Sequence, residues 1–325
     1  MDLLIAALGL VILLLAGDAL VKGAVNLSLR LGIPALIVSL TIVAFGTSAP
    51  ELLIAVQAIG EGAPGLALGN VVGSNTANVL LVLGIPALVT TLHSSVCDSR
   101  KSYLQMMAAT ALFMGVAWFG PITWVHGIIL LAALAWMLMS AIGVARCHRR
   151  DVAACKKVTE EKDVEGADPE MRGWKIAMYL LVGIIGLPLG ADLLVDSATS
   201  IARAYNVSDT VIGLTLVAIG TSLPELATTV MAALRKQADV ALGNVIGSNM
   251  FNLLAIIGLS SFVGDIPVDP GMLSYDMWVM AGASALLGLF VLGKRDISRA
   301  WGVVLVALYI GYIAVILTGT GTVHA

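Results

Sequence analysis

The sequence predicts an all-α polytopic membrane protein of ten transmembrane helices, arranged as two five-helix repeats of inverted topology. Of its 325 residues, 59% are hydrophobic and only 12% are charged, whereas soluble domains carry about 25% charged residues. Apolar runs long enough to cross a bilayer recur along the chain. One segment also occurs twice, and an odd number of expected spans separates its two copies.

Hydropathy and helix-breaking residues divide the chain into the ten expected spans. The first run has no basic residue before it, so we expect a retained helix rather than a signal peptide. Within this run Asp18 and Lys22 lie one helical turn apart, which predicts an ion pair. The expected spans cover about residues 3–29, 33–60, 64–91, 102–119, 122–143, 173–203, 208–234, 238–263, 273–292 and 298–318.

A polar segment of mixed charge, residues 144–172, interrupts the apolar pattern near the middle of the chain. We expect it to form a loop outside the membrane, because charged residues are expensive to bury in lipid. The expected organisation is therefore a first five-helix half at residues 1–143, the loop at 144–172 and a second five-helix half at 173–325.

The distribution of basic residues predicts the orientation of these spans. If both termini lie outside, the inner segments hold 16 of the 18 Lys and Arg residues, leaving Arg203 outside and Lys22 inside the first span. Lys and Arg accumulate on the cytoplasmic side of membrane proteins. We therefore expect a multi-pass protein of the cell inner (plasma) membrane, with the 144–172 loop in the cytoplasm. The cysteines, Cys97, Cys147 and Cys155, would then be free thiols on the reducing side.

The repeated segment comprises residues 39–84 and residues 213–258. The two copies align without a gap at an offset of 174, with 23 identities in 46 positions. Shared composition explains the matches between apolar residues but not the identities at Gly, Thr, Ser, Pro, Glu and Asn. Because five spans separate the copies, the second copy is expected to enter the membrane from the opposite face. Many secondary transporters have this architecture, with ion sites at broken helices near the bilayer midplane.

The first shared motif places a carboxylate beside a helix breaker. It reads G-T-S-A-P-E at residues 46–51 and G-T-S-L-P-E at residues 220–225, each within an apolar span. Proline lacks an N–H and clashes with the carbonyl four residues earlier, which frees backbone carbonyls. A lone proline would indicate only a kink, but an unpaired carboxylate in hydrocarbon costs about 2.5–3.5 kcal/mol. Apart from Lys22, no Lys or Arg lies at comparable depth. Glu51 and Glu225 are therefore expected to be protonated or to hold cations.

The second shared motif is rich in amides and hydroxyls. It reads G-N-V-V-G-S-N-T-A-N at residues 69–78 and G-N-V-I-G-S-N-M-F-N at residues 243–252. Its GxxxG steps predict close helix packing, which does not explain the amides. Ser74 and Asn78 are four residues apart on one helix face, as are Ser248 and Asn252. We expect this face, which Asn70 extends by one turn, to lie opposite the carboxylate of a neighbouring broken helix.

All these candidate ligands carry oxygen. Oxygen-only coordination suits Ca²⁺ and Na⁺, and the lack of thiolate or imidazole argues against zinc and copper. Two carboxylates neutralise one divalent ion or accommodate monovalent ions in turn, which an exchanger requires. The expected ion-binding residues are Glu51, Glu225, Ser48, Ser222, Ser74, Ser248, Asn78 and Asn252, together with the freed carbonyls.

The paired GTSxPE and GNxxGSN segments resemble the two α-repeats of the cation/calcium exchanger (CaCA) superfamily, specifically its prokaryotic sodium/calcium antiporter branch. The resemblance covers nearly the whole chain. It implies secondary active exchange of Na⁺ for Ca²⁺ by alternating access, with the first and sixth spans sliding as a gate across the core. It also implies that Ala44, Thr47, Ala218 and Thr221 line the site, with Glu51 and Glu225 as its central carboxylates.

Two departures from the family pattern bear on the coupling ion. Asn252 stands where archaeal and potassium-dependent relatives carry Asp, which removes a third charge and disfavours potassium co-transport. Gly73 and Gly247 stand where the proton/calcium branch tends to carry Glu, which favours sodium over protons. An exchanger of H⁺ for Ca²⁺ or another divalent cation, a K⁺-dependent Na⁺/Ca²⁺ exchanger and an ion channel remain the alternatives.

Other classes of function are not expected. A hydrolase that used Ser48 or Ser222 would need a histidine or aspartate base at the same depth, and the sequence places none there. We therefore expect no enzyme and no cofactor, only transported Ca²⁺ and Na⁺. The expected partners are the lipid bilayer and these cations, with no nucleic acid and no obligate protein partner.

Overall fold

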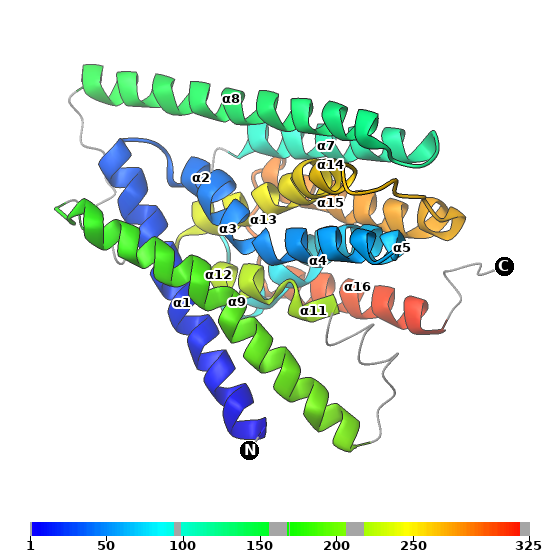
Figure 1. The fold of residues 1–325 in the computed structure, drawn as a ribbon. Coiled ribbons are helices and arrows are strands. Elements are labelled where there is room, and N and C mark those ends of the chain that lie inside the picture. Colours follow the sequence, from blue (N-terminus) through cyan, green and yellow to red (C-terminus); the bar gives the residue numbers. More distant parts are fainter. Residues whose placement is uncertain (1, 94–98, 156–167, 169, 206–217, 319–325) are drawn as a thin grey trace.

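The computed structural model describes residues 2–93, 99–155, 168, 170–205 and 218–318 (Figure 1). Within that part of the chain the regular structure is helical, apart from two isolated β-bridges that join Leu92 to Ile297 and Ile122 to Ile266. The all-α prediction is therefore confirmed. The thiols of Cys97, Cys147 and Cys155, the subject of one prediction, lie outside the described residues.

The described elements fall into two groups along the chain, one before residue 156 and one after residue 172. Those before residue 156 are α1 (Asp2–Leu31), α2 (Ala35–Val38), η1 (Ser39–Val43), α3 (Ala44–Thr47), α4 (Ala49–Gly60), α5 (Pro64–Ala77), η2 (Asn78–Val82), α6 (Gly84–Val89), α7 (Arg100–Trp118) and α8 (Trp124–Cys155). Those after residue 172 are α9 (Gly173–Ala204), α11 (Ala218–Gly220), α12 (Leu223–Leu234), α13 (Ala238–Met250), η5 (Phe251–Ile256), α14 (Ile257–Ser260), η6 (Met272–Asp276), α15 (Met277–Val291) and α16 (Arg299–Thr318). The η elements are π-helical turns, which are frequent at functional sites.

Within the described residues, seven helical segments are long and apolar enough to cross a membrane. The pair Ala35–Thr47 and Ala49–Gly60, bent by 43°, makes an eighth candidate. The fourth expected span, α7, begins with Arg100 and Lys101 and is too polar to qualify. The seventh is represented by α12, which has only 12 residues. The seven segments are Asp2–Leu31, Pro64–Val89, Trp124–Arg146, Gly173–Ala204, Ala238–Ser260, Met272–Val291 and Arg299–Ile316.

Helix α8 corrects the predicted start of the central loop. It continues without a break to Cys155, so residues 144–155, expected to be loop, are helical. The segment VARCHRRDVAAC contains no Gly or Pro and is rich in Ala and Arg, which are good helix formers. Its charge opposes burial in lipid but does not end a helix.

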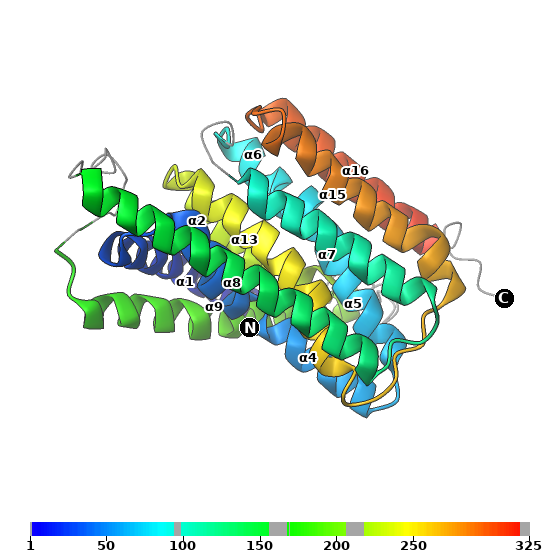
Figure 2. The same ribbon diagram turned by 90° about the horizontal axis from the view of Figure 1, so that it is seen from above.

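The described parts of the two repeated segments, residues 39–84 and 218–258, lie in the interior of the fold (Figures 1 and 2). Nearly every side chain of α13 and η5 is buried, and so are most of those of α5 and η2. The pair α7 and α8 covers one side of this centre, and α15 and α16 cover another. This arrangement places the polar motifs in the interior and leaves apolar outer faces for lipid.

Helices α1 and α9 cross a third side of the centre as an antiparallel pair (Figure 1). Glycines allow their backbones to approach closely. A Cβ atom on Gly183 would lie 2.9 Å from the Cα of Leu20, and one on Gly190 would lie 2.9 Å from the carbonyl oxygen of Gly9. Small residues at such crossings are typical of helix packing in membranes.

Candidate ion-binding site

Both GTSxPE motifs break their helices at the serine. Ser48 separates α3 from α4 with φ −88° and ψ 6°, and Ser222 precedes α12 with φ −90° and ψ 3°. Each following helix begins with a proline in its first turn, where the missing N–H is not needed. The predicted helix breaks are therefore present in both motifs, with the same backbone conformation.

The helix breaks place Glu51 and Glu225 in the first turns of α4 and α12. The N-terminal end of a helix carries a partial positive charge, which favours a carboxylate there. The two side chains are 1% and 0% exposed. They belong to one cluster of polar side chains, because Ser48, in the motif of Glu51, donates a hydrogen bond to Glu225. Neither glutamate forms a salt bridge in the part of the chain that the structure describes.

Glu225 is bound by hydroxyls from both repeats. Ser48 Oγ donates a hydrogen bond to Glu225 Oε1 at 3.0 Å, and Ser248 Oγ donates to the same oxygen at 3.5 Å. The equivalent groups around Glu51 are arranged differently. Ser222 Oγ and Ser74 Oγ are buried without a hydrogen-bond partner, as is Glu51 Oε2. The site is therefore asymmetric although its sequence is repeated.

The threonines of the first motif tie each repeat to the other. Thr47 Oγ1 donates to Asn244 Oδ1 at 3.3 Å, and Thr221 Oγ1 donates to Asn70 Oδ1 at 3.3 Å. These two contacts are equivalent with the repeats exchanged, because Thr221 corresponds to Thr47 and Asn244 corresponds to Asn70 at the offset of 174. Thr47 Oγ1 also lies 3.4 Å from Ser248 Oγ.

The amide-rich helices meet through their asparagines. Asn75 Nδ2 donates to the carbonyl oxygen of Asn249 at 3.2 Å, and Asn249 Nδ2 donates to the carbonyl oxygen of Asn75 at 3.4 Å. Asn78 Nδ2 donates to Asn249 Oδ1 at 3.0 Å. Asn78 begins η2 and Asn252 lies in η5, so both predicted amide ligands stand in π-helical turns.

Buried oxygen atoms without a donor gather in these motifs. Such atoms are uncommon in native proteins and call for an explanation such as an ion. A cation would satisfy acceptor oxygens of this kind, since carboxylate, amide and hydroxyl oxygens are the ligands that Ca²⁺ takes. The unpartnered oxygens are Glu51 Oε2, Glu225 Oε2, Ser74 Oγ, Ser222 Oγ, Asn75 Oδ1, Asn78 Oδ1 and Asn252 Oδ1.

The remaining predicted residues lie beside this group. Ala44 is fully buried, and its carbonyl accepts a hydrogen bond from Thr47 Oγ1 at 3.2 Å. The side chain of Ala218 lies outside the described residues. The residues that the sequence analysis left out of the site are Asn75, Asn244 and Asn249. Each of them is identical to its equivalent in the other copy, which was the signal available in the sequence. In the structure they join the two repeats to each other.

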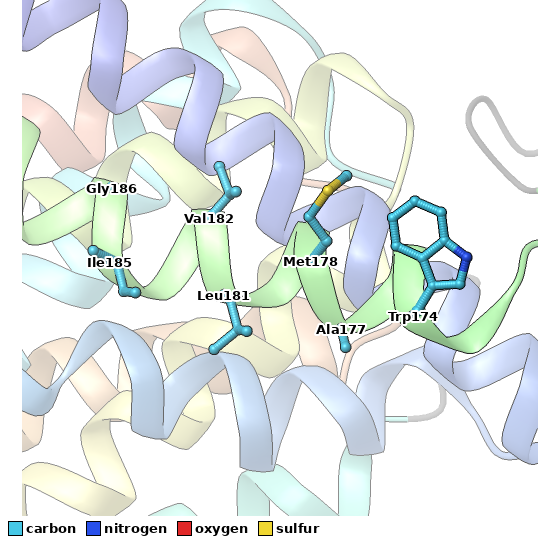
Figure 3. A pocket seen from close by; sticks show the side chains of 7 residues that line it. All are labelled: Trp174, Ala177, Met178, Leu181, Val182, Ile185 and Gly186. Atoms are coloured by element: carbon cyan, nitrogen blue, oxygen red, sulfur yellow. The ribbon is translucent and has the colours of Figure 1, made fainter.

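A small cavity of about 120 Å³ lies next to both helix breaks. Pro50, Pro224 and Thr221 line it from the motifs, and Asp192 and Asp196 line it from α9. A larger hollow of about 540 Å³ follows α9 from Trp174 to Gly186 (Figure 3). Its lining is apolar, as expected for a surface that faces lipid, so it is not a candidate ion site.

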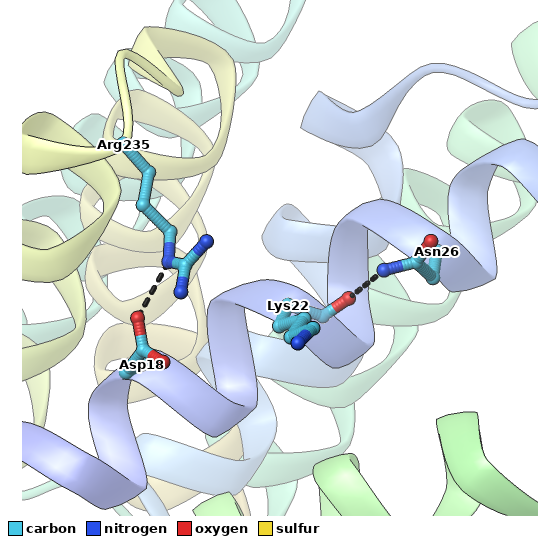
Figure 4. Close-up of polar contacts among 4 residues, drawn as sticks. All are labelled: Asp18, Lys22, Asn26 and Arg235. Carbon is cyan, nitrogen blue, oxygen red and sulfur yellow. Dashed lines mark hydrogen bonds and ion pairs between the residues drawn. The ribbon is translucent and has the colours of Figure 1, made fainter. Parts of the chain in front are cut away.

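The predicted pair between Asp18 and Lys22 is wrong. Asp18 instead forms a salt bridge with Arg235 Nε, just after α12 (Figure 4). The Lys22 Nζ lies 4.9 Å from the centre of the Tyr179 ring, and the Lys22 carbonyl accepts a hydrogen bond from Asn26 Nδ2 at 2.8 Å. Helical spacing allows the local pair, but tertiary contacts across helices determine the partners.

The described residues contain no group of three or more His, Cys, Asp or Glu side chains that could hold a metal ion. The candidate site offers two carboxylates, Glu51 and Glu225, and a larger number of neutral oxygens. Such a set binds hard cations but lacks the soft ligands that favour zinc or copper.

A family model and curated relatives match most of this chain. The family model described as sodium/calcium exchanger protein matches residues 1–143 and 175–318. The inner membrane protein YrbG of Escherichia coli is 34% identical over 95% of this chain and 94% of its own. The sodium/calcium exchanger MaX1 of Methanosarcina acetivorans is 31% identical over 97% of this chain and 98% of its own.

A solved structure has the same fold. It is that of the sodium-calcium exchanger NCX_Mj soaked with 2.5 mM Na⁺ and 1 mM Sr²⁺, which superposes with a TM-score of 0.80 and 31% identity. The similarity covers 96% of this chain and 97% of the other. The chain therefore belongs to the sodium/calcium exchanger protein family, a family of membrane cation transporters.

Proposed function

We propose that this protein is a secondary active antiporter that exchanges Na⁺ for Ca²⁺ by alternating access. One observation carries the proposal. Glu51 and Glu225 are both buried among oxygens that lack donors, without a salt bridge in the described part of the chain, and Ser48, in the motif of Glu51, donates a hydrogen bond to Glu225. Two charges in a medium of low dielectric need neutralisation, and transported cations can supply it.

The same carboxylate pair explains why transport would be an exchange. One Ca²⁺ neutralises both glutamates, and so do two Na⁺ ions. An empty site would move two unneutralised charges through a dry interior, which is expensive. The site therefore reorients loaded, and Ca²⁺ moving one way is coupled to Na⁺ moving the other. Asn252, in place of a third carboxylate, keeps the total charge of the ligand set at two.

The neutral residues complete this site in distinct ways. Ser48 and Ser248 hold Glu225 by hydrogen bonds at 3.0 and 3.5 Å. Ser222, Ser74, Asn78 and Asn252 offer oxygens that have no donor. Thr47 and Thr221 join the repeats beside the site, next to Ala44 and Ala218, whose positions the family resemblance assigns to its lining.

The asymmetry around the two glutamates supports alternating access. In an inverted repeat, the two halves adopt different packings and exchange them during transport. The serine contacts formed around Glu225 would then form around Glu51 in the opposite state. We propose ten spans in two inverted five-helix repeats, with α1 and α9 as the gate. The close antiparallel packing of α1 and α9 allows them to move as one body.

We also propose that both termini lie outside and residues 144–172 lie in the cytoplasm of a cell with an inner membrane. The enrichment of Lys and Arg in the corresponding segments supports this orientation. The printed name of the relative YrbG, an inner membrane protein, supports the location.

A proton-coupled exchanger of Ca²⁺ or another divalent cation is the second candidate. The observation that favours it is the same carboxylate pair, because protons can also neutralise a buried glutamate. A K⁺-dependent exchanger is disfavoured by Asn252, which offers no additional charge.

Flux into proteoliposomes separates these candidates. Purified protein is reconstituted, and uptake of radioactive calcium is measured with outward sodium, potassium or proton gradients imposed one at a time. The proposal expects uptake with the sodium gradient alone. Uptake driven by the proton gradient, with sodium without effect, would establish the second candidate instead. Uptake without any gradient, accompanied by conductance in planar bilayers, would identify a channel.

A further inference from the structure

The amide of Asn249 is fixed by the backbone of the opposite repeat. Its contact with the carbonyl oxygen of Asn75, at 3.4 Å, can be made only by a donor, so the NH₂ group of Asn249 must face Asn75. The Oδ1 atom of Asn249 then points to the other side, where Asn78 lies. Hydrogen-bond chemistry alone therefore sets the orientation of the Asn249 amide.

The orientation of Asn249 in turn determines that of Asn78. The atom of Asn78 that lies 3.0 Å from Asn249 Oδ1 must be a donor and is therefore Nδ2. Asn78 Oδ1 is left on the opposite side of its amide, and it is buried without a hydrogen-bond partner. An amide that could rotate would present NH₂ to a cation for part of the time. The contact with Asn249 prevents this.

The second half of the site lacks this arrangement. Asn75 makes the reciprocal bond to the Asn249 backbone at 3.2 Å, but Asn75 Oδ1 has no donor. Neither Nδ2 nor Oδ1 of Asn252, the residue equivalent to Asn78, has a hydrogen-bond partner. Asn75 and Asn249 therefore make the same contact between the repeats, and only Asn249 also holds a ligand amide.

We propose that Asn249 is a positioning residue that fixes the amide of Asn78 with its oxygen directed at the transported cation. The inference rests on the proposed function, because it takes Asn78 to be a ligand. It adds a role for a residue that does not itself touch the ion. A ligand that is held in place needs no reorganisation when the cation arrives.

The chain offers a matched control in Asn75. Asn75→Ala removes one hydrogen bond between the repeats, whereas Asn249→Ala removes the equivalent bond and also the bond that holds Asn78. In proteoliposome flux, Asn249→Ala is expected to raise the KM for Ca²⁺ by about tenfold or more, as loss of such a supporting contact does at metal sites. Asn75→Ala removes a buried amide oxygen of the candidate site but leaves Asn78 held by Asn249, so it is expected to raise the KM for Ca²⁺ less than Asn249→Ala does. The maximal rate should change less than KM in both variants.

A second comparison separates positioning from general support of the fold. In an Asn78→Ala background, Asn249→Ala should raise KM no further, because there is no amide left to orient. Asn249→Leu and Asn75→Leu are measured in parallel, in case the Ala variants do not fold. Leucine fills the space that alanine would leave empty. The Leu pair should differ in KM in the same way.

Three results would contradict the inference. Equal KM for the Asn249 and Asn75 variants, or an Asn249 effect that persists fully in the Asn78→Ala background, would overturn the positioning role alone. An Asn78→Ala variant with the KM of the unmodified protein would show that Asn78 is not a ligand, and would overturn that part of the proposed site together with this inference.

Discussion

Ser48 in the first repeat donates its hydroxyl to the carboxylate of Glu225 in the second, with Oγ and Oε1 3.0 Å apart. The equivalent pair, Ser222 and Glu51, makes no such contact, since Ser222 Oγ and Glu51 Oε2 are both without a partner. A repeated sequence thus gives two local structures in one chain. This difference between the halves is the basis for the prediction about the two serines.

The glutamates are predicted to be indispensable for exchange. Glu51→Gln and Glu225→Gln each remove one of the two charges that neutralise Ca²⁺, so each should abolish sodium-driven calcium uptake in proteoliposomes. Folding should survive, because glutamine keeps the size of the side chain and a neutral group is less expensive to bury. Normal transport by either variant, with unchanged elution from a gel-filtration column, would show that the site is elsewhere.

The serines are predicted to differ in their contribution to stability. Ser48→Ala removes a hydrogen bond to a carboxylate and should lower the free energy of unfolding by about 1.5–3 kcal/mol. Ser222→Ala removes a buried hydroxyl that has no partner, so it should not lower the free energy of unfolding. Thermal unfolding in detergent, with cation-free buffer, measures both. Equal losses of stability would mean that the two halves have the same contacts in solution.

Alanine at the second glycine of each GxxxG step is predicted to affect the stability of the protein differently in the two repeats. A Cβ atom on Gly247 would lie 2.5 Å from the carbonyl oxygen of Leu40 and 2.6 Å from the Cβ of Ala44. Gly247→Ala should therefore destabilise the protein by about 1–3 kcal/mol through overpacking. Gly73, at the equivalent position, would meet no atom within 4 Å. Gly73→Ala should be tolerated, and a large loss of stability there would contradict the packing described.

The salt bridge between Asp18 and Arg235 is predicted to hold α1 against the end of α12. The two side chains are 30% and 19% exposed, so solvent screens the pair. Asp18→Asn should lower stability by about 0.2–1 kcal/mol, and less at high salt. In a double-mutant cycle with Arg235→Gln, the double variant should lose less than the sum of the two single variants. Strict additivity of the two losses of stability would show that the salt bridge contributes nothing to the stability of the protein.

Much of the fold follows from the sequence because the signals are local. The breaks at Ser48 and Ser222 follow from the adjacent prolines, and the central placement of the repeats follows from polar residues within apolar spans. The end of α8 could not be predicted in this way. Hydropathy reports where a helix leaves the membrane, and residues 144–155 remain helical beyond that point.

The ligand types of the candidate site were also accessible from the sequence, but its contacts were not. Spacing placed Ser74 and Asn78 on one face, and in the structure the elements that carry them, α5 and η2, pack against α4 and α12 respectively. Spacing also suggested that Asp18 pairs with Lys22, whereas the partner is Arg235, more than 200 residues away in sequence. The roles of Asn75 and Asn249 depend on how two distant helices meet, and no local pattern contains that information.

The central claim is that Glu51 and Glu225 share a transported cation. Anomalous diffraction from crystals soaked in Sr²⁺, a heavier analogue of Ca²⁺, tests it most directly. An anomalous peak is expected between the two carboxylates, displaced by excess Ca²⁺ and absent from the Glu51→Gln, Glu225→Gln double variant. Well-diffracting crystals of the unmodified protein with no peak between these carboxylates would contradict it.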